Sequence, residues 1–190
     1  MNNFELALDE SLLVMDSLRG MSESVHTAAE RCISALKAGG KLLICGNGGS
    51  AAQAQHLTAE LVGRYKRERD PLAAVTLGTD SSLLTCIGND FSFDEIFSRE
   101  VRALGRPGDV IIAFSTSGNS PNIIHALTAA KAIGMGTVSF LGRDGGSALA
   151  LSDCALVVDH QDTARIQEAH LFLMHSLMDV IESGLKGMDD

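Results

Sequence analysis

The chain has 190 residues, of which 45% are hydrophobic, and a formal net charge of -9. This length and composition suit one domain with a substantial core and argue against disorder. The negative charge argues against a nucleic-acid partner, because the phosphates of nucleic acids would be repelled. No apolar run approaches the ~20 residues of a membrane span, and the N-terminus lacks a signal-peptide pattern. The four cysteines form no CxxC pair, so we expect a reduced, cytoplasmic protein without membrane association.

Residues 1–38, here called the N-terminal arm, are predicted to be helical. Apolar residues recur at helical spacing over residues 4–37, with a bend between two helices expected near Gly20. A glycine pair at 39–40 is expected to end this region. The arm carries more apolar residues than a lone surface helix needs, so we expect it to pack in an oligomer.

Beyond the arm, residues 39–190 predict an α/β core in which strands and helices alternate. Strands are expected near residues 41–45, 73–77, 109–114, 137–141 and 154–158. Helices are expected near residues 50–66, 80–87, 93–103, 120–133, 145–151 and 164–186. This alternation predicts a mostly parallel five-stranded sheet with helices on both faces. No repeat or linker interrupts it, so a single domain over 1–190 is expected.

Two Gly- and Ser-rich turns follow predicted strands. One contains Ser115, Thr116, Ser117 and Ser120, and the other runs Gly46-Asn47-Gly48-Gly49-Ser50; each leads into a predicted helix. Hydroxyls and backbone N–H groups at a helix N-terminus favour an anion such as phosphate. The alternative is an ordinary Ser- or Thr-rich helix cap. Because ligands of parallel sheets bind beyond the carboxyl ends of the strands, the pair of turns favours a phosphate site.

Ionisable residues stand on two of the predicted helices. His56 and Glu60 are spaced i, i+4 and therefore project from one helix face, which suits a metal or a proton transfer but also fits a solvent-facing pair. Gln167 and His175 lie about 12 Å apart along the last helix. These two could share a metal only if both side chains reach inward or if two subunits contribute. His175 lies among apolar residues and needs a partner, whereas His170 is expected to be a packing histidine.

A third candidate lies at Gly88-Asn89-Asp90, which follows a predicted helix. Asn and Asp beside Gly are ordinary turn formers. Asn89 and Asp90 are therefore candidate site residues only in combination with the other motifs.

Together these motifs resemble the phosphoheptose isomerases, a family of sugar isomerase (SIS) domain proteins. The similarity runs from about residue 40 to about residue 180, in matching order and spacing. It rests on Gly46-Asn47-Gly48-Gly49-Ser50, His56 with Glu60, Gly88-Asn89-Asp90, Ser115-Thr116-Ser117-Gly118-Asn119-Ser120, and Arg165-Ile166-Gln167-Glu168 with His175. The Ser/Thr turn alone indicates only an SIS domain, whereas the whole set is far more specific.

The resemblance implies a three-layer α/β fold and a homotetramer with active sites between subunits. It implies conversion of D-sedoheptulose 7-phosphate into D-glycero-D-manno-heptose 7-phosphate through an enediol, the first step of nucleotide-activated heptose synthesis for lipopolysaccharide core or surface glycan. The implied phosphate ligands are Ser115, Thr116, Ser117 and Ser120. The implied further substrate contacts are Asn47, Gly48, Gly49, Glu60, Asn89, Asp90 and Gln167. The implied ligands of one zinc ion per subunit are His56, Glu60, Gln167 and His175.

The family's acid–base pair corresponds to Glu60 and His175. We hypothesise that Glu60 moves the carbon-bound proton between C1 and C2 and that His175 moves protons at the two oxygens. A zinc-bound carboxylate is a weaker base. Glu60 therefore either leaves the ion when substrate arrives, or the ion mainly orients the site.

Two other functions are considered. A related SIS tetramer is no enzyme and binds the bacterial replication initiator DnaA; it is expected to lack counterparts of Glu60 and His175, which this chain has. The other alternative is an SIS enzyme that acts on a different sugar phosphate, such as a hexose 6-phosphate.

Overall fold

The computed structural model describes residues 2–186. Its centre is a five-stranded parallel sheet with the strand order β2-β1-β3-β4-β5. The strands are β1 (Leu42–Gly46), β2 (Ala74–Thr76), β3 (Val110–Ser115), β4 (Gly136–Gly142) and β5 (Cys154–Val158). All five strands were predicted to within one residue at each end, because each is a short apolar run flanked by turn-forming residues.

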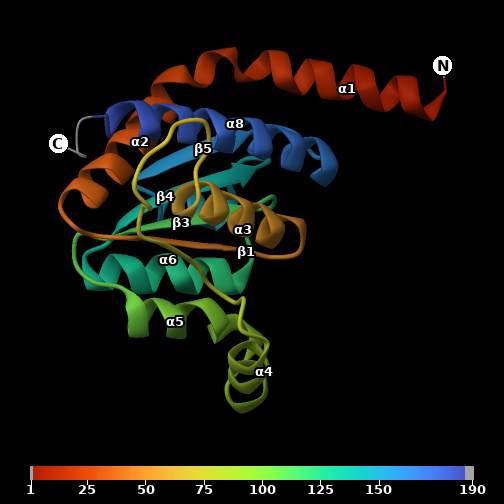
Figure 1. Ribbon diagram of the computed structural model, residues 1–190. Coiled ribbons are helices and arrows are strands. Elements are labelled where there is room, and N and C mark those ends of the chain that lie inside the picture. Colours follow the sequence, from red (N-terminus) through yellow and green to blue (C-terminus); the bar gives the residue numbers. More distant parts are fainter. Residues whose placement is uncertain (1, 187–190) are drawn as a thin grey trace.

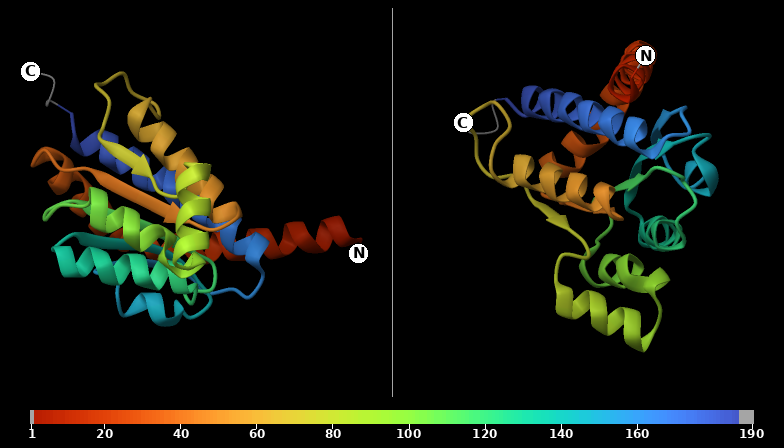
Figure 2. Two further views of the ribbon diagram at one scale, coloured as in Figure 1. Left: turned by 90° about the horizontal axis from the view of Figure 1, so that it is seen from below. Right: turned by 90° about the vertical axis from the view of Figure 1, so that its right-hand side faces the viewer.

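Helices cover both faces of this sheet (Figures 1 and 2). They are α1 (Asn3–Ser17), α2 (Ser22–Lys37), α3 (Gly49–Val62), α4 (Ser81–Asp90), α5 (Ile96–Leu104), α6 (Pro121–Ile133), α7 (Gly146–Leu149) and α8 (Thr163–Gly184). Two short 3-10 helices, η1 (Leu18–Met21) and η2 (Phe93–Glu95), complete the set. The predicted bend in the N-terminal arm is η1, and the helix predicted over 93–103 divides into η2 and α5.

Two apolar cores lie on the two faces of the sheet. Along β1, Leu42 and Ile44 pack in the core with α2, α3 and α8, whereas Leu43 and Cys45 pack in the core with α5 and α6. This division follows from the strand period of two, which sends successive side chains to opposite faces. The expected three-layer α/β fold is therefore present, with the N-terminal helix α1 projecting beyond the other layers (Figure 2).

The helix predicted over residues 50–66 is too long, because α3 ends at Val62. At Gly63 the chain leaves the helix axis, and the backbone N–H groups that follow donate to an acceptor outside the helix. The N–H groups of Tyr65, Lys66 and Arg67 donate to the carboxylate of Glu182, on α8. A partner 115 to 117 residues away in the sequence thus replaces the helical carbonyls, which local propensity cannot foresee.

The helix predicted over residues 80–87 is too short, because α4 continues through Gly88-Asn89-Asp90 and has Phe91 as its C-cap. Asp80 caps the start of α4 by accepting from the N–H groups of Ser82 and Leu83. This cap stabilises the first turn of α4, and the turn-forming residues at 88–90 do not end the helix.

Glu182 makes the stability of the protein depend on pH. Burial by itself would raise the pKa of this carboxyl, but its backbone hydrogen bonds and the charge of Arg69 outweigh burial and hold the pKa below its usual value. Ionised Glu182 therefore stabilises the fold above the unfolded-state pKa of about 4.3, and this contribution is lost as the pH falls through the lower folded-state pKa.

We expect the melting temperature of the wild type to fall more steeply than that of Glu182→Gln between about pH 5 and about pH 3. Circular-dichroism melts of both proteins across this range would measure the difference. Other carboxyls titrate equally in both proteins, so parallel curves would contradict the assignment to Glu182.

None of the helices in the described part of the chain is long and apolar enough to cross a lipid bilayer.

Candidate active site

The two Gly/Ser turns lie side by side at the carboxyl ends of β1 and β3. These strands are neighbours, with Gly46 opposite Phe114. The chain leaves β1 toward β2 on one side and leaves β3 toward β4 on the other, so this is the point at which the strand order reverses. In open parallel sheets, ligands bind in the crevice at such a point.

The β3–α6 turn is held in shape by a glycine and by hydrogen bonds within the turn. Gly118 has a φ of +64°, and an added Cβ would overlap the Gly145 carbonyl oxygen. The Gly118 N–H donates to Ser115 Oγ at 3.1 Å, and the Asn119 N–H donates to Ser117 Oγ at 3.1 Å. Ser115 is buried, so its hydroxyl shapes the turn from within.

The other hydroxyls of this turn are partly exposed. Thr116, Ser117 and Ser120 each retain solvent access. Ser120 occupies the N-cap of α6, yet its side chain makes no capping hydrogen bond. The arrangement leaves hydroxyls at the positive end of a 13-residue helix, where an anion is stabilised.

The β1–α3 turn is joined to the β3–α6 turn by a pair of side-chain amides. Asn47 Nδ2 donates to Asn122 Oδ1 at 2.8 Å, and Asn122 Nδ2 donates to Asn47 Oδ1 at 2.9 Å. Gly48, with φ 57° and ψ -122°, adopts a conformation that favours glycine. Sequence reasoning missed the role of Asn122, which is buried in the first turn of α6; an Asn directly after the Ser/Thr turn was the signal that the sequence offered.

Gln167, from α8, also reaches the β1–α3 turn. A Cβ added to Gly49 would lie 2.6 Å from Gln167 Nε2, so Gly49 leaves the room that this side chain occupies. Gln53, one turn further along α3, donates from Nε2 to the Gln167 carbonyl oxygen at 2.6 Å. The first turn of α3 and the start of α8 are thereby locked together.

A second group of candidates lies further along α3 and α8. His56, Glu60 and His175 each offer a ligand atom, and these atoms lie within 4.8 Å of one another. His56 Nε2 and Glu60 Oε1 are 3.0 Å apart, and the centroids of the two imidazoles are 5.1 Å apart with the rings nearly perpendicular at 78°. The i, i+4 pair therefore faces α8 and meets His175 there.

The surroundings of His175 favour its uncharged form. Partial burial and the neighbouring His56 lower its pKa below the usual histidine value, against the opposing pull of Glu60. A neutral imidazole can accept a proton or bind a metal ion.

Not every predicted site residue lies at the two Gly/Ser turns or in the cluster of His56, Glu60 and His175. Asn89 and Asp90 are exposed at the end of α4, and their side chains hydrogen-bond to each other at 2.8 Å. Figure 1 shows α4 on the side of the molecule away from α3 and α8. The Gln167 side chain lies beside Gly49. Gly49 precedes His56 by seven residues, which is about 10 Å along α3. Within one chain, Gln167 is therefore too far from His56, Glu60 and His175 to share a metal ion with them.

His170 is the packing histidine that the sequence predicted. It is fully buried, its Nε2 lies 3.0 Å from the Leu141 carbonyl oxygen, and its ring lies edge-on to Phe114 and Phe140. Burial lowers its pKa to about 4, so it is neutral at physiological pH and takes no part in the two groups above.

Comparison with known proteins identifies the family. The SIS domain model matches residues 9–142. A phosphoheptose isomerase from Bordetella avium is 48% identical over 94% of this chain and 92% of its own length, and one from Helicobacter pylori is 52% identical over 87% and 86%. The solved structure of a phosphoheptose isomerase from Neisseria gonorrhoeae has a TM-score of 0.90 at 46% identity, covering 95% of this chain and 97% of that one.

The chain belongs to the phosphoheptose isomerase family.

The donor set of this family member could hold a metal ion, and its chemistry suits zinc. Two imidazoles and one carboxylate, as in His56, His175 and Glu60, are ligands that zinc prefers, and three protein ligands leave a position open for substrate or water. The neutral state of His175 suits this role, because a ligating imidazole must be unprotonated.

Tyr65 is a residue of the site that sequence reasoning missed. Its ring stacks on the His175 imidazole, with centroids 5.5 Å apart and 14° between the planes. It is the one tyrosine of the chain and lies just beyond α3, so its proximity to Glu60 was visible in the sequence but its contact with α8 was not.

Proposed function

We propose that this phosphoheptose isomerase family member converts D-sedoheptulose 7-phosphate into D-glycero-D-manno-heptose 7-phosphate, the first step of nucleotide-activated heptose synthesis. The observation that carries the proposal is the meeting of Glu60 and His175, the pair expected to perform the acid–base chemistry, beside His56. The names of the relatives support the same activity.

The β3–α6 turn is proposed to hold the phosphate. Hydroxyls of Thr116, Ser117 and Ser120 would donate to its oxygens at the N-terminus of α6, with Ser115 shaping the turn. Asn47, Gly48, Gly49 and Gln167 are proposed to contact the sugar chain directly. Asn89 and Asp90 lie at the exposed end of α4, away from these turns, so their proposed contact with the sugar chain would come from a neighbouring subunit. The phosphate is remote from the reacting carbons, so its binding energy fixes C1 and C2 against the acid–base pair.

The isomerisation moves one proton between adjacent carbons. Glu60 is proposed to remove the proton from the carbon beside the carbonyl and to return it to the neighbouring carbon, through an enediol or enediolate. His175, neutral in the resting state, would carry protons between O1 and O2. The 19% exposure of the Glu60 side chain leaves its carboxylate accessible to substrate.

His56, Glu60 and His175 are proposed to hold one zinc ion in each subunit, joined by Gln167. When bound, the ion would polarise the carbonyl oxygen of the substrate. Because Gln167 lies at Gly49 within one chain, we propose that its contribution comes across a contact between subunits.

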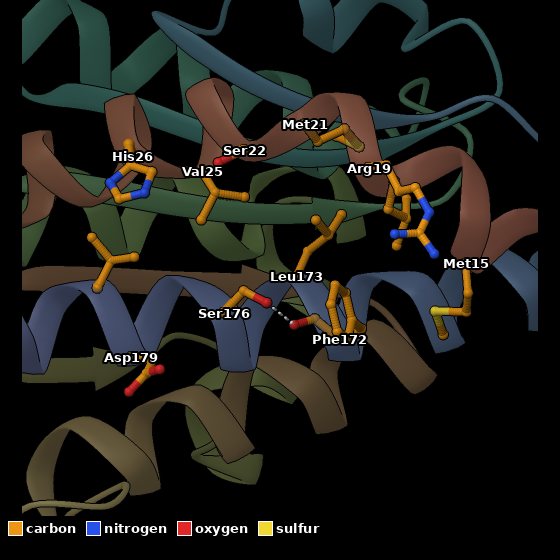
Figure 3. A pocket seen from close by; sticks show the side chains of 12 residues that line it. Met15, Arg19, Met21, Ser22, Val25, His26, Phe172, Leu173, Ser176 and Asp179 are labelled. Atoms are coloured by element: carbon orange, nitrogen blue, oxygen red, sulfur yellow. Dashed lines mark hydrogen bonds between the residues drawn. The ribbon is translucent and has the colours of Figure 1, made fainter.

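A homotetramer with active sites between subunits fits these positions. Helix α1 exposes large apolar side chains, among them Phe4 at 74% and Leu13 at 73%. A groove of about 630 Å³ runs between the N-terminal arm and α8 and is lined by Leu18, Val25 and Leu173 (Figure 3). Such surfaces suit burial against further copies of the chain, and the arm would then serve oligomer packing.

The binder of the initiator DnaA is the less favoured reading. That relative is expected to lack the counterparts of Glu60 and His175, and both are present and adjacent here. A different sugar phosphate as substrate would bind its phosphate at the same β3–α6 turn. Only the contacts to the hydroxyl groups of the sugar would differ.

The deciding experiment is turnover of sedoheptulose 7-phosphate by the purified protein, with and without added zinc. We expect turnover by the wild type and a loss of roughly 100-fold or more in His175→Ala. His125→Ala is the matched control, because His125 is exposed, pairs with Glu95 and lies on α6, on the face of the sheet opposite α3 and α8. A folded wild type that is inactive with every metal tested would redirect the proposal to initiator binding or another sugar phosphate.

A further inference from the structure

The loop after α3 is anchored to the far half of α8 by a buried carboxylate. The Glu182 side chain is fully buried. Its oxygens accept from the N–H groups of Tyr65 at 3.0 Å, Lys66 at 3.1 Å and Arg67 at 3.1 Å. Figure 1 shows this loop rising from α3 beside the ribbon of α8. Three hydrogen bonds to one charged group fix the backbone of the loop at Tyr65.

Arg69 ties the end of α3 to the same carboxylate. Its Nε donates to Glu182 Oε1 at 3.1 Å, and its guanidinium also donates to the carbonyl oxygens of Glu60 at 2.6 Å and Leu61 at 2.8 Å. Those carbonyls belong to the last turn of α3, where helical partners run out. The backbone that carries Glu60 and the backbone that carries Tyr65 are therefore held by one buried ion pair.

The ring of Tyr65 lies against one face of His175. The two planes are 14° from parallel, while His56 meets the His175 ring at 78°. Lys66 Nζ lies 4.8 Å from the centroid of the Tyr65 ring, which adds a cation–π contact. Thus the His175 imidazole has an aromatic neighbour on its face and a second at an edge, and both restrict its rotation.

We propose that Tyr65 is a positioning residue for the acid–base pair. The ring of Tyr65 holds the His175 imidazole in its working orientation, and Glu182 and Arg69 hold Tyr65 in place. This inference rests on the proposed function of His175. A proton carrier must direct a ring nitrogen at the substrate oxygens, and a small misplacement of such a group costs rate far more than affinity. The hydroxyl of Tyr65 is not needed for this role.

The test compares Tyr65→Ala with Tyr65→Phe. Removing the ring is expected to lower kcat roughly 10- to 100-fold with little change in KM for sedoheptulose 7-phosphate. Tyr65→Phe keeps the stacked ring and is expected to stay close to the wild type. Melting temperatures of both variants verify that the protein is folded.

Several outcomes would overturn the proposal. These are wild-type kcat in Tyr65→Ala, a rise in KM alone, or a loss in Tyr65→Phe as large as in Tyr65→Ala. The last result would assign the role to the hydroxyl, and the second would make Tyr65 a substrate contact.

A second measurement keeps this test separate from that of the proposed function. NMR of protein labelled at its six histidines reports the ring protons of His175, identified by their loss in His175→Ala. The stacked ring of Tyr65 shifts these signals, so they should move in Tyr65→Ala and stay in Tyr65→Phe even if sedoheptulose 7-phosphate proves not to be the substrate. Signals that stay in place in Tyr65→Ala would refute the positioning role.

Discussion

Replacing Glu60 by glutamine is expected to reduce turnover of sedoheptulose 7-phosphate by roughly 100- to 10,000-fold, the range of a lost general base. The change keeps the shape of the side chain and removes its ability to take a proton from carbon. The position is partly open to solvent, and its backbone is held by Arg69 rather than by the carboxylate, so the fold should be unaffected. Steady-state kinetics and thermal melts measure the two effects.

Glu30→Gln is the matched control for this substitution. Glu30 is exposed on α2 and lines a hollow with Asp109 at the amino ends of the strands, opposite the candidate site. Turnover by Glu30→Gln should therefore equal that of the wild type. Zinc content is measured in all three proteins, because Glu60 is also proposed to bind the ion. Unchanged turnover by Glu60→Gln would remove Glu60 from the mechanism, whereas a loss restored by excess zinc would assign it to metal binding alone.

The sequence predicted the parts of this fold that depend on local pattern. Apolar runs such as 110–114 located the strands, and the strand period of two then divided their side chains between two cores. The end of α3 was not predictable, because it depends on Glu182, whose carboxylate draws the N–H groups of Tyr65 to Arg67 out of the helix. Sequence pattern near residue 63 carries no information about a side chain on α8.

The candidate site divides in the same way. The i, i+4 spacing of His56 and Glu60 located one half of the second group correctly, because that geometry is internal to a helix. The arrival of His175 beside them depends on how α8 packs on α3, and the expectation came from family resemblance. The Asn47–Asn122 pair joins two turns 75 residues apart, so the individual residues were visible but their union was not.

Gly118→Ala is expected to destabilise the fold and to weaken substrate binding together. Gly118 has a φ of +64°, and the added methyl group would meet the backbone of Gly145, which belongs to the segment leading into α7. The Gly118 carbonyl oxygen also accepts from the Ala148 N–H at 2.9 Å, so neither backbone can retreat without losing this bond. We expect a loss of stability of at least about 2 kcal/mol and a kcat/KM reduced by more than about tenfold.

Gly39→Ala separates the two causes of this effect. Gly39 has a φ of +79°, but a Cβ there meets nothing within 4 Å. Gly39 precedes β1 and thus lies at the amino ends of the strands, whereas the two turns lie at the carboxyl ends. It should therefore show only the cost of the left-handed conformation, about 1 kcal/mol, with kcat/KM unchanged. Denaturant unfolding and kinetics on both variants make the comparison. Equal losses of stability in the two variants, with wild-type kcat/KM in Gly118→Ala, would mean that the β3–α6 turn tolerates the methyl group and does not hold the phosphate in the way proposed.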